Sequence, residues 1–344
     1  MYENFYNFTE KPFNTTPDSR FFFPSPKHTE ALNSLIYAIN ERKGFVVITG
    51  EIGAGKTTVY RTMLNKLDIN TKTAVITNTH LTPKELICEI LDELEIEYKS
   101  GTKQKLISQL NAYLIQQLSA DINVVLIIDE AQNLSPKTLE EVRMLSNLET
   151  EREKLIQIIL IGQPQLKAKL ENPKLEQFKQ RIAVYYHIPS LNQQETEEYI
   201  MHRLKLVSPD GSYEQIFTKS ALEAIYTHSR GIPRLINLIA DSALLSGYIY
   251  EQRQIDERII QDVIKERDFS HQNADVSHIV VSSQYENSHI PKIYCCLDCQ
   301  YYSTCETKWF RGINGEEQLC CAKCNNYHYC LKKVVTLKDK ATVQ

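Results

Sequence analysis

The chain has 344 residues, of which 42% are hydrophobic and 24% charged, and its net charge is -4. This is the composition of a globular protein with two or three compact units, so fibrous and largely disordered classes are excluded. Residues 1–13 do not read as a targeting segment, and no stretch reaches the roughly 18 to 20 apolar residues of a membrane span, so we expect a cytoplasmic protein.

The part of the chain between residues 44 and 161 alternates short β-branched runs with longer helical patterns. This alternation is typical of a parallel sheet covered by helices. The expected strands are almost continuously apolar, as buried parallel strands are, and they span residues 45–50, 73–77, 124–129 and 155–162. Thr82 and Glu85 predict a capping box that opens a helix, and Ser135 predicts another helix start.

The strand signal disappears after about Asn192, which indicates a small all-helical domain. Its expected helices span residues 193–207, 218–229, 233–250 and 256–267. The polar stretch 268–291 has no helical periodicity and ends in a proline, as a linker does. We therefore expect four parts, namely an α/β core at 1–190, a helical domain at 191–267, a linker at 268–291 and a cysteine-rich module at 292–344.

The stretch "GEIGAGKTT" at residues 50–58 fits the pattern G-x-x-x-x-G-K-[ST]. In this pattern, glycines let backbone N–H groups surround phosphates, Lys56 reaches the β- and γ-phosphates, and the Thr57 hydroxyl binds Mg²⁺. The stretch lies between an expected strand and an expected helix, a context that brings phosphate to a helix N-terminus. It predicts a site for ATP and Mg²⁺ made of Gly50, Glu51, Ile52, Gly53, Ala54, Gly55, Lys56, Thr57 and Thr58.

Two acidic residues end the expected strand of "VVLIIDEAQNL". Asp129 is placed to hold Mg²⁺ through its water shell, and Glu130 is placed to polarise an attacking water. The alternative is that Glu130 is a solvated surface acid, which five preceding apolar residues disfavour. A carboxylate beside the metal favours ATP hydrolysis over phosphoryl transfer to a second substrate. Gln163, after the next strand, either touches the γ-phosphate or the attacking water, or caps the strand end.

With these residues, the chain resembles the AAA+ ATPases, and within them the ExeA/GspA-like group, over about residues 2–265. The resemblance rests on the Walker A loop "GEIGAGKTT", the Walker B strand "VVLIIDEAQNL", the lid motif "GIPRLINLIADSAL" and the N-terminal segment "FYNFTEKPFNTTPDSRFFFPSPKHTEAL". It implies a P-loop NTPase fold with a parallel sheet core and a helical lid.

The resemblance also implies roles for three further residues. Gln163 falls at the sensor 1 position, and Arg234 in "GIPR" matches the sensor 2 arginine that approaches the γ-phosphate from the lid. Arg181 in "FKQRIAVYY" falls where such ATPases place an arginine finger that reaches a neighbouring subunit. By its local sequence alone, Arg181 reads as a surface arginine near a helix C-terminus.

In this family, bound nucleotide controls the association of subunits into rings or filaments, and the members act as assembly or remodelling factors. ExeA-like members support secretion or pilus machinery, and related TnsC/MuB ATPases bind duplex DNA and recruit transposase. A secretion-type member would continue into a transmembrane helix, whereas here a cysteine cluster follows Ile290. We therefore expect a self-associating ATPase acting on an assembly machine, with a DNA-binding transposition regulator as the alternative; Glu130 and the lid disfavour a P-loop kinase.

Eight of the nine cysteines lie between residues 295 and 330. The two CxxC pairs Cys296/Cys299 and Cys321/Cys324 have nearly the spacing of a four-cysteine zinc site, and in a reducing compartment metal ligation is favoured over disulfides. Zinc would supply the folding energy that so short a segment lacks. We expect one structural Zn²⁺.

Other ligand sets remain open in this module. Cys295 and Cys320 could replace their neighbours, and Cys305, Cys330 and His328 could build a second site. The module weakly resembles a GATA-type finger. From residue 292 onward, eight Lys/Arg stand against five Asp/Glu, so contact with duplex DNA and docking to a protein are equally compatible with it.

Overall fold

The computed structural model describes residues 1–267 apart from residues 100, 152 and 210. The predicted linker and the cysteine-rich module, with all its proposed zinc ligands, lie outside the described residues. Those predictions therefore stay predictions.

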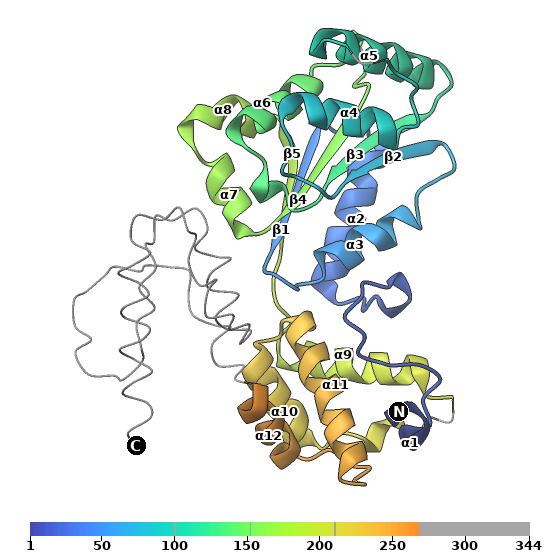
Figure 1. Ribbon diagram of the computed structural model, residues 1–344, viewed down its shortest axis with the longest axis vertical. Coiled ribbons are helices and arrows are strands. Elements are labelled where there is room, and N and C mark those ends of the chain that lie inside the picture. The colour runs from blue at the N-terminus through green and yellow to red at the C-terminus, as the bar shows by residue number, and fades with distance from the viewer. Residues whose placement is uncertain (100, 152, 210, 268–344) are drawn as a thin grey trace, which may run out of the picture. The chain divides into compact units, whose positions relative to one another are not determined.

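A five-stranded parallel sheet forms the centre of the α/β part (Figure 1). Its strand order is β2-β3-β4-β1-β5. The strands are β1 Phe45–Gly50, β2 Thr71–Ile76, β3 Asn123–Ile128, β4 Gln157–Gly162 and β5 Ile182–Ile188. The predicted parallel sheet is confirmed, and β1 and β4 are buried at every position because neighbours flank them on both sides.

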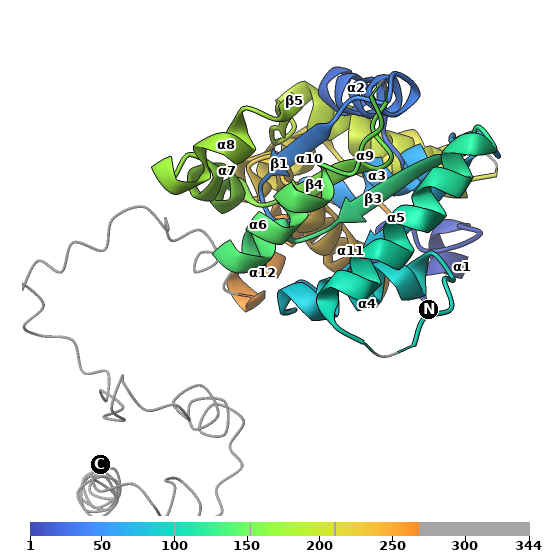
Figure 2. The same ribbon diagram turned by 90° about the horizontal axis from the view of Figure 1, so that it is seen from above.

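Helices cover both faces of this sheet, as Figure 2 shows from above. Alternate strand residues point to opposite faces, so Val46 and Ile48 pack on one side with α2 and α3 while Phe45 and Val47 pack on the other. The first group is α2 Pro26–Asn40 and α3 Lys56–Leu64. The second group is α4 Pro83–Glu93, α5 Lys103–Ser119, α6 Pro136–Leu145, α7 Pro164–Leu170 and α8 Glu176–Lys179.

The predicted helix starts at Thr82 and Ser135 are confirmed by their hydrogen bonds. The Thr82 hydroxyl accepts from the Glu85 N–H at 3.4 Å, and the Glu85 carboxylate accepts from the Thr82 N–H at 2.8 Å. The Ser135 hydroxyl accepts from the Thr138 N–H at 3.1 Å. These caps satisfy N–H groups that have no partner within the helix.

Four helices follow the sheet and form a separate layer with its own core. They are α9 Gln193–Val207, α10 Lys219–Ser229, α11 Pro233–Ile249 and α12 Glu257–Arg267, within one residue of the predicted limits. Short 3-10 turns lie at η1 Ser19–Phe21, η2 Ala131–Asn133, η3 Pro173–Leu175 and η4 Ser212–Gln215. Among the described residues, no helix combines the length and apolar character needed to cross a membrane.

The N-terminal segment, residues 1–21, packs its aromatic side chains into the helical domain (Figure 1), while its residues 17 and 19 are hydrogen-bonded to α3. It includes the short helix α1 Tyr2–Tyr6. Its buried aromatic side chains join the core of that domain, and they are Tyr2, Tyr6, Phe8, Phe13 and Phe21. The predicted boundaries place this segment in the α/β core, whereas its aromatic side chains lie in the core of the helical domain. The difference arises because these aromatic side chains lack a periodic pattern that would identify their partner.

Candidate active site

The predicted motifs meet at one edge of the sheet. The loop at residues 51–55 follows β1, the acidic pair follows β3, and Gln163 follows β4. These three strands are neighbours in the order β3-β4-β1, and the carboxyl ends of parallel strands lie at the same edge. Such an edge is the usual ligand site of an open α/β sheet.

The loop between β1 and α3 has the backbone of a phosphate-binding loop. Gly53 and Gly55 adopt φ values of 81° and 92°, which favour glycine because it has no Cβ. A Cβ on Gly53 would lie 2.5 Å from the Cβ of Arg234, so no side chain fits there. Gly55 is the N-cap of α3, and the first N–H groups of that helix have no partner within it.

Lys56 lies inside the loop, with only 6% of its surface exposed. Its Nζ donates hydrogen bonds to the backbone oxygens of Gly50 and Glu51, both at 2.9 Å. Burial lowers the pKa of Lys56, while the nearby charges of Glu130 and Asp129 oppose that effect. The two backbone oxygens therefore hold the Lys56 ammonium group inside the curve of the loop.

Thr57 and Asp129 bring two side-chain oxygens together. The Thr57 hydroxyl donates to Asp129 Oδ2 at 3.4 Å, and Asp129 is 7% exposed. Burial raises the pKa of Asp129. A hydroxyl and a carboxylate are the hard oxygen donors that Mg²⁺ prefers, so this pair fits the predicted metal site.

Glu130 is held by two side-chain amides and is not a solvated surface acid. Its Oε2 accepts from Gln132 Nε2 at 2.5 Å and from Gln163 Nε2 at 3.1 Å. Its backbone is left-handed, with φ 50°, and its N–H donates to Asp129 Oδ1 at 2.9 Å. The left-handed backbone at Glu130 ends β3 and turns the Glu130 carboxylate toward Gln163.

Gln163 contacts Glu130, and its predicted contact with the γ-phosphate or the attacking water stays a prediction. It is the N-cap residue of α7, at the end of β4, and its side chain reaches Glu130. Its backbone N–H donates to Gln132 Oε1 at 3.0 Å. Gln132 therefore bridges the loops after β3 and β4, a role that sequence reasoning missed because the two loops are far apart in the chain.

The two arginines of the predicted site have different surroundings. The backbone N–H of Arg234 donates to the Gly53 oxygen at 3.2 Å, so the phosphate-binding loop caps the N-terminus of α11, and the Arg234 side chain is exposed. Arg181 instead contacts the end of α6, where its Nη1 donates to Ser146 Oγ at 2.8 Å and to Asn147 Oδ1. The structure brings Arg234 to the loop and holds Arg181 on another part of its own chain.

Two further residues around the site were missed by the sequence analysis. Lys169 of α7 donates to the backbone oxygens of Gln132 and Leu134, at 2.5 and 2.8 Å, and so fixes the loop that carries Glu130. His28 of α2 contacts Ala54 in the phosphate-binding loop, with 2.9 Å between Nε2 and the backbone oxygen. Neither residue has a sequence signal, since each lies outside the motif that it supports.

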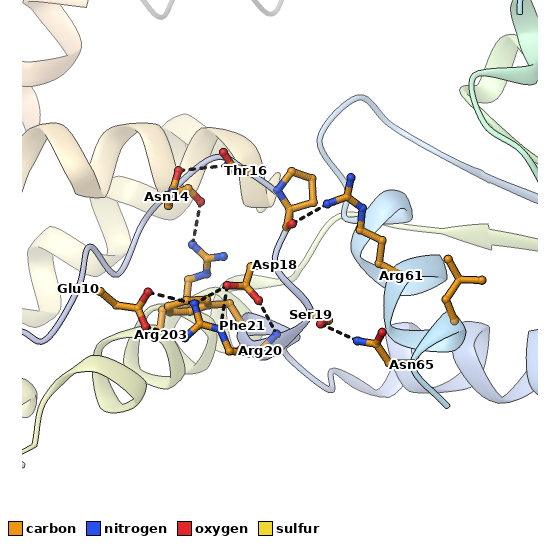
Figure 3. A pocket seen from close by; sticks show the side chains of 12 residues that line it. Glu10, Asn14, Thr16, Asp18, Ser19, Arg20, Phe21, Arg61, Asn65 and Arg203 are labelled. Carbon is orange, nitrogen blue, oxygen red and sulfur yellow. Dashed lines mark hydrogen bonds and ion pairs between the residues drawn. The ribbon is translucent and has the colours of Figure 1, made fainter. Parts of the chain in front are cut away.

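A separate cavity of about 390 Å³ lies between the N-terminal segment, α3 and α9 (Figure 3). Arg61 of α3 donates to the Pro17 oxygen at 2.9 Å, and Asn65 donates to Ser19 Oγ at 2.8 Å. The acidic side chains around the cavity are engaged by Arg20. These contacts link the N-terminal segment to the helix that follows the phosphate-binding loop.

Within the described ranges, no group of three or more His, Cys, Asp and Glu side chains is placed to hold a metal ion. The predicted zinc ligands Cys296, Cys299, Cys321 and Cys324 lie beyond residue 267, outside these ranges. Zinc ligation is therefore left as a prediction.

The chain is similar in sequence to known proteins. Residues 39–170 match the AAA domain family. The chain is 41% identical over 249 residues to General secretion pathway protein A of Aeromonas hydrophila, covering 72% of this chain and 45% of that protein. The chain thus spans less than half the length of this relative.

Solved structures share the fold at low sequence identity. Cdc6p from Pyrobaculum aerophilum matches with a TM-score of 0.57 and 18% identity, covering 72% of this chain and 71% of that chain. The ORC2 protein of Aeropyrum pernix in its ADP form matches with a TM-score of 0.58 and 13% identity, covering 78% and 75%. At these identities the likeness concerns the fold alone.

Proposed function

We propose that this chain, which carries an AAA domain at residues 39–170, binds ATP with Mg²⁺ and hydrolyses it to ADP and phosphate. The observation that carries the proposal is the Glu130 carboxylate, which two amides hold beside Asp129, while Asp129 contacts Thr57 of the phosphate-binding loop. A positioned carboxylate next to a phosphate site provides a base for water.

Each residue has a role in this proposal. Lys56 and the N–H groups of residues 50–58 bind the phosphates, and Thr57 and Asp129 hold Mg²⁺, which when bound neutralises charge on the phosphate oxygens. Glu130 orients the attacking water and accepts its proton, and Gln163 holds that carboxylate in place. The protein then needs no covalent intermediate, because positioning and electrostatic stabilisation supply the catalysis.

The two arginines complete the proposed site from outside the α/β core. Arg234, on the first turn of α11, approaches the γ-phosphate from the helical domain. Arg181 acts as a finger toward the nucleotide of a neighbouring subunit, for which it must leave the end of α6. An arginine supplied by a neighbour ties hydrolysis to assembly.

The test is a comparison of ATP binding and ATP turnover in the full chain. Lys56→Ala should abolish nucleotide binding, whereas Glu130→Gln should bind ATP but turn it over at least about 100-fold more slowly, because it keeps the shape of the side chain and loses the base. Glu97→Gln, at an exposed position, is the matched control. Turnover by Glu130→Gln at the wild-type rate would refute the assignment.

For the cellular role, we propose a nucleotide-controlled assembly factor that self-associates and acts on a secretion, pilus or related machine. The support is the identity to General secretion pathway protein A over most of the described chain. The C-terminal module would dock the ATPase on its partner.

Sizing of the full chain with ATP, with ADP and without nucleotide tests self-association. Repeating it with duplex DNA at two salt concentrations tests the DNA-binding alternative, because phosphate contacts weaken as salt rises. A chain that stays monomeric with ATP contradicts the assembly role, and binding of duplex DNA that weakens as salt rises favours the transposition-type regulator.

A further inference from the structure

His28 lies behind the phosphate-binding loop, on the first turn of α2. The residue is 6% exposed, and its Nε2 lies 2.9 Å from the backbone oxygen of Ala54. The packing is tight, since a Cβ on Gly55 would lie 3.0 Å from this nitrogen. The ring therefore fills the space directly behind the turn of the loop.

The Ala54 oxygen determines which ring nitrogen carries the hydrogen, because a carbonyl oxygen only accepts and Nε2 is the nitrogen that faces it. The hydroxyl of Ser25, the N-cap of α2, accepts from the His28 N–H at 3.3 Å and lies 2.8 Å from His28 Nδ1. With that N–H pointing at the oxygen, the hydroxyl hydrogen is free to donate to Nδ1. Burial lowers the pKa of His28, which favours the neutral ring. The neutral ring then carries its hydrogen on Nε2 and donates it to Ala54.

The peptide bond between Ala54 and Gly55 transmits this contact to the other side of the loop. A trans peptide is planar, and its C=O and N–H point in opposite directions. Because His28 holds the Ala54 oxygen from behind, the Gly55 N–H points away from α2. The glycine at φ 92° would otherwise let this peptide rotate at little cost.

We propose that His28 is a positioning residue for the phosphate-binding loop, which it holds in the orientation that presents the Gly55 N–H to the β-phosphate of a nucleotide. This inference rests on the proposed ATP site. It assigns the preorganisation of the loop to a side chain 26 residues upstream of Ala54, outside the motif.

The test measures the dissociation constants of ATP and ADP, each with Mg²⁺, for the full-length protein. His28→Ala should weaken both nucleotides by a similar factor of about 3 to 10, since both carry a β-phosphate and one hydrogen bond is lost. His28→Gln should restore both constants to within about twofold, because the glutamine amide can donate from nearly the position of Nε2. Ser25→Ala should have an intermediate effect.

His202→Ala is the matched control, since His202 is a partly buried histidine of α9 that packs on Phe23 rather than on the loop. Melting temperatures separate lost stability from lost affinity. Unchanged affinities in His28→Ala, or no recovery in His28→Gln, would overturn the inference while the wild type still binds ATP. If the wild type itself fails to bind ATP and ADP, the proposed function fails.

Discussion

Asp129 illustrates, at the scale of one residue, how a proposed Mg²⁺ site opposes stability. Burial raises the pKa of this carboxyl above its usual 3.8. A carboxyl with a raised folded-state pKa adds stability below its unfolded-state pKa, and that contribution is lost as the pH rises through the folded-state value. Near neutral pH the charged carboxylate therefore destabilises the folded chain relative to a neutral side chain in its place.

Asp129→Asn should consequently raise the melting temperature of the nucleotide-free chain at pH 7. The gain should shrink toward pH 4, where the wild-type carboxyl takes up its proton. The same variant should lose on the order of 100-fold in Mg²⁺-dependent turnover, because the proposed role of Asp129 is to hold Mg²⁺ through its water shell and the metal contributes several kcal/mol of charge stabilisation. Calorimetry and a phosphate-release assay measure the two effects, with exposed Asp68→Asn as control. A lower melting temperature at pH 7 would contradict this account.

At the scale of elements, the loops around the site hold one another. Gln132 joins the loop after β3 to the start of α7, and Lys169 of α7 returns to the same loop. The phosphate-binding loop caps α11, because the Gly53 oxygen accepts from the Arg234 N–H, which has no partner within that helix. A change in the loop therefore acts directly on the first turn of α11.

Arg181 connects the start of β5 to the end of α6, where a cation is favoured by the helix dipole. If this arginine also serves a neighbouring subunit, Arg181→Ala should bind ATP normally and turn it over roughly 1000-fold more slowly. Mixing Arg181→Ala with Glu130→Gln should recover part of the activity, because each variant supplies what the other lacks. Melting temperatures report any loosening of α6.

The mixing experiment separates a role between subunits from a structural one. A mixture no more active than the sum of its separate components means that Arg181 acts only within its own chain. A mixture of Arg181→Ala with Lys56→Ala is a second complementation experiment, since the Lys56→Ala subunit binds no nucleotide but still supplies Arg181 to its neighbour. It should also recover activity if subunits associate through one nucleotide-bound face.

At the scale of the described molecule, the N-terminal segment contributes to the core of the helical domain and is also hydrogen-bonded to α3. Phe13 is 1% exposed and packs edge to face on Phe217, with ring centres 6.3 Å apart. Phe13→Ala should lower the free energy of unfolding by about 3 to 5 kcal/mol, as removal of a buried ring does. Denaturation in urea measures it, with exposed Tyr37→Ala as control. A loss as small as that of the control would contradict the packing.

The cysteine-rich module adds a prediction that the described residues do not test. The full chain should carry about one zinc ion per molecule if the two CxxC pairs form a four-thiolate site. Replacing Cys296 and Cys321 by serine should remove the metal, whereas Cys88→Ser in α4 should retain it. Elemental analysis of the purified protein gives the answer. Zinc at the same level in the double variant would exclude these ligands.

The sequence by itself determined the elements whose signals are local. The spacing of Gly50, Gly55 and Lys56, the apolar run before Asp129, and the caps at Thr82 and Ser135 all act within a few residues, so they could be recognised without the fold. The four helices of the helical domain followed from periodicity for the same reason. The parallel sheet followed from strands separated by helices.

Only the tertiary structure decided which distant segments meet. The contacts of Gln132 with Gln163, of His28 with Ala54 and of Arg181 with α6 join residues more than 25 positions apart, and no local pattern encodes such pairs. The N-terminal aromatic residues lie in the core of the helical domain, a placement that no local pattern in the sequence indicates. Hydrophobic burial is non-directional, so a sequence identifies the side chains that leave water without naming the surface that receives them.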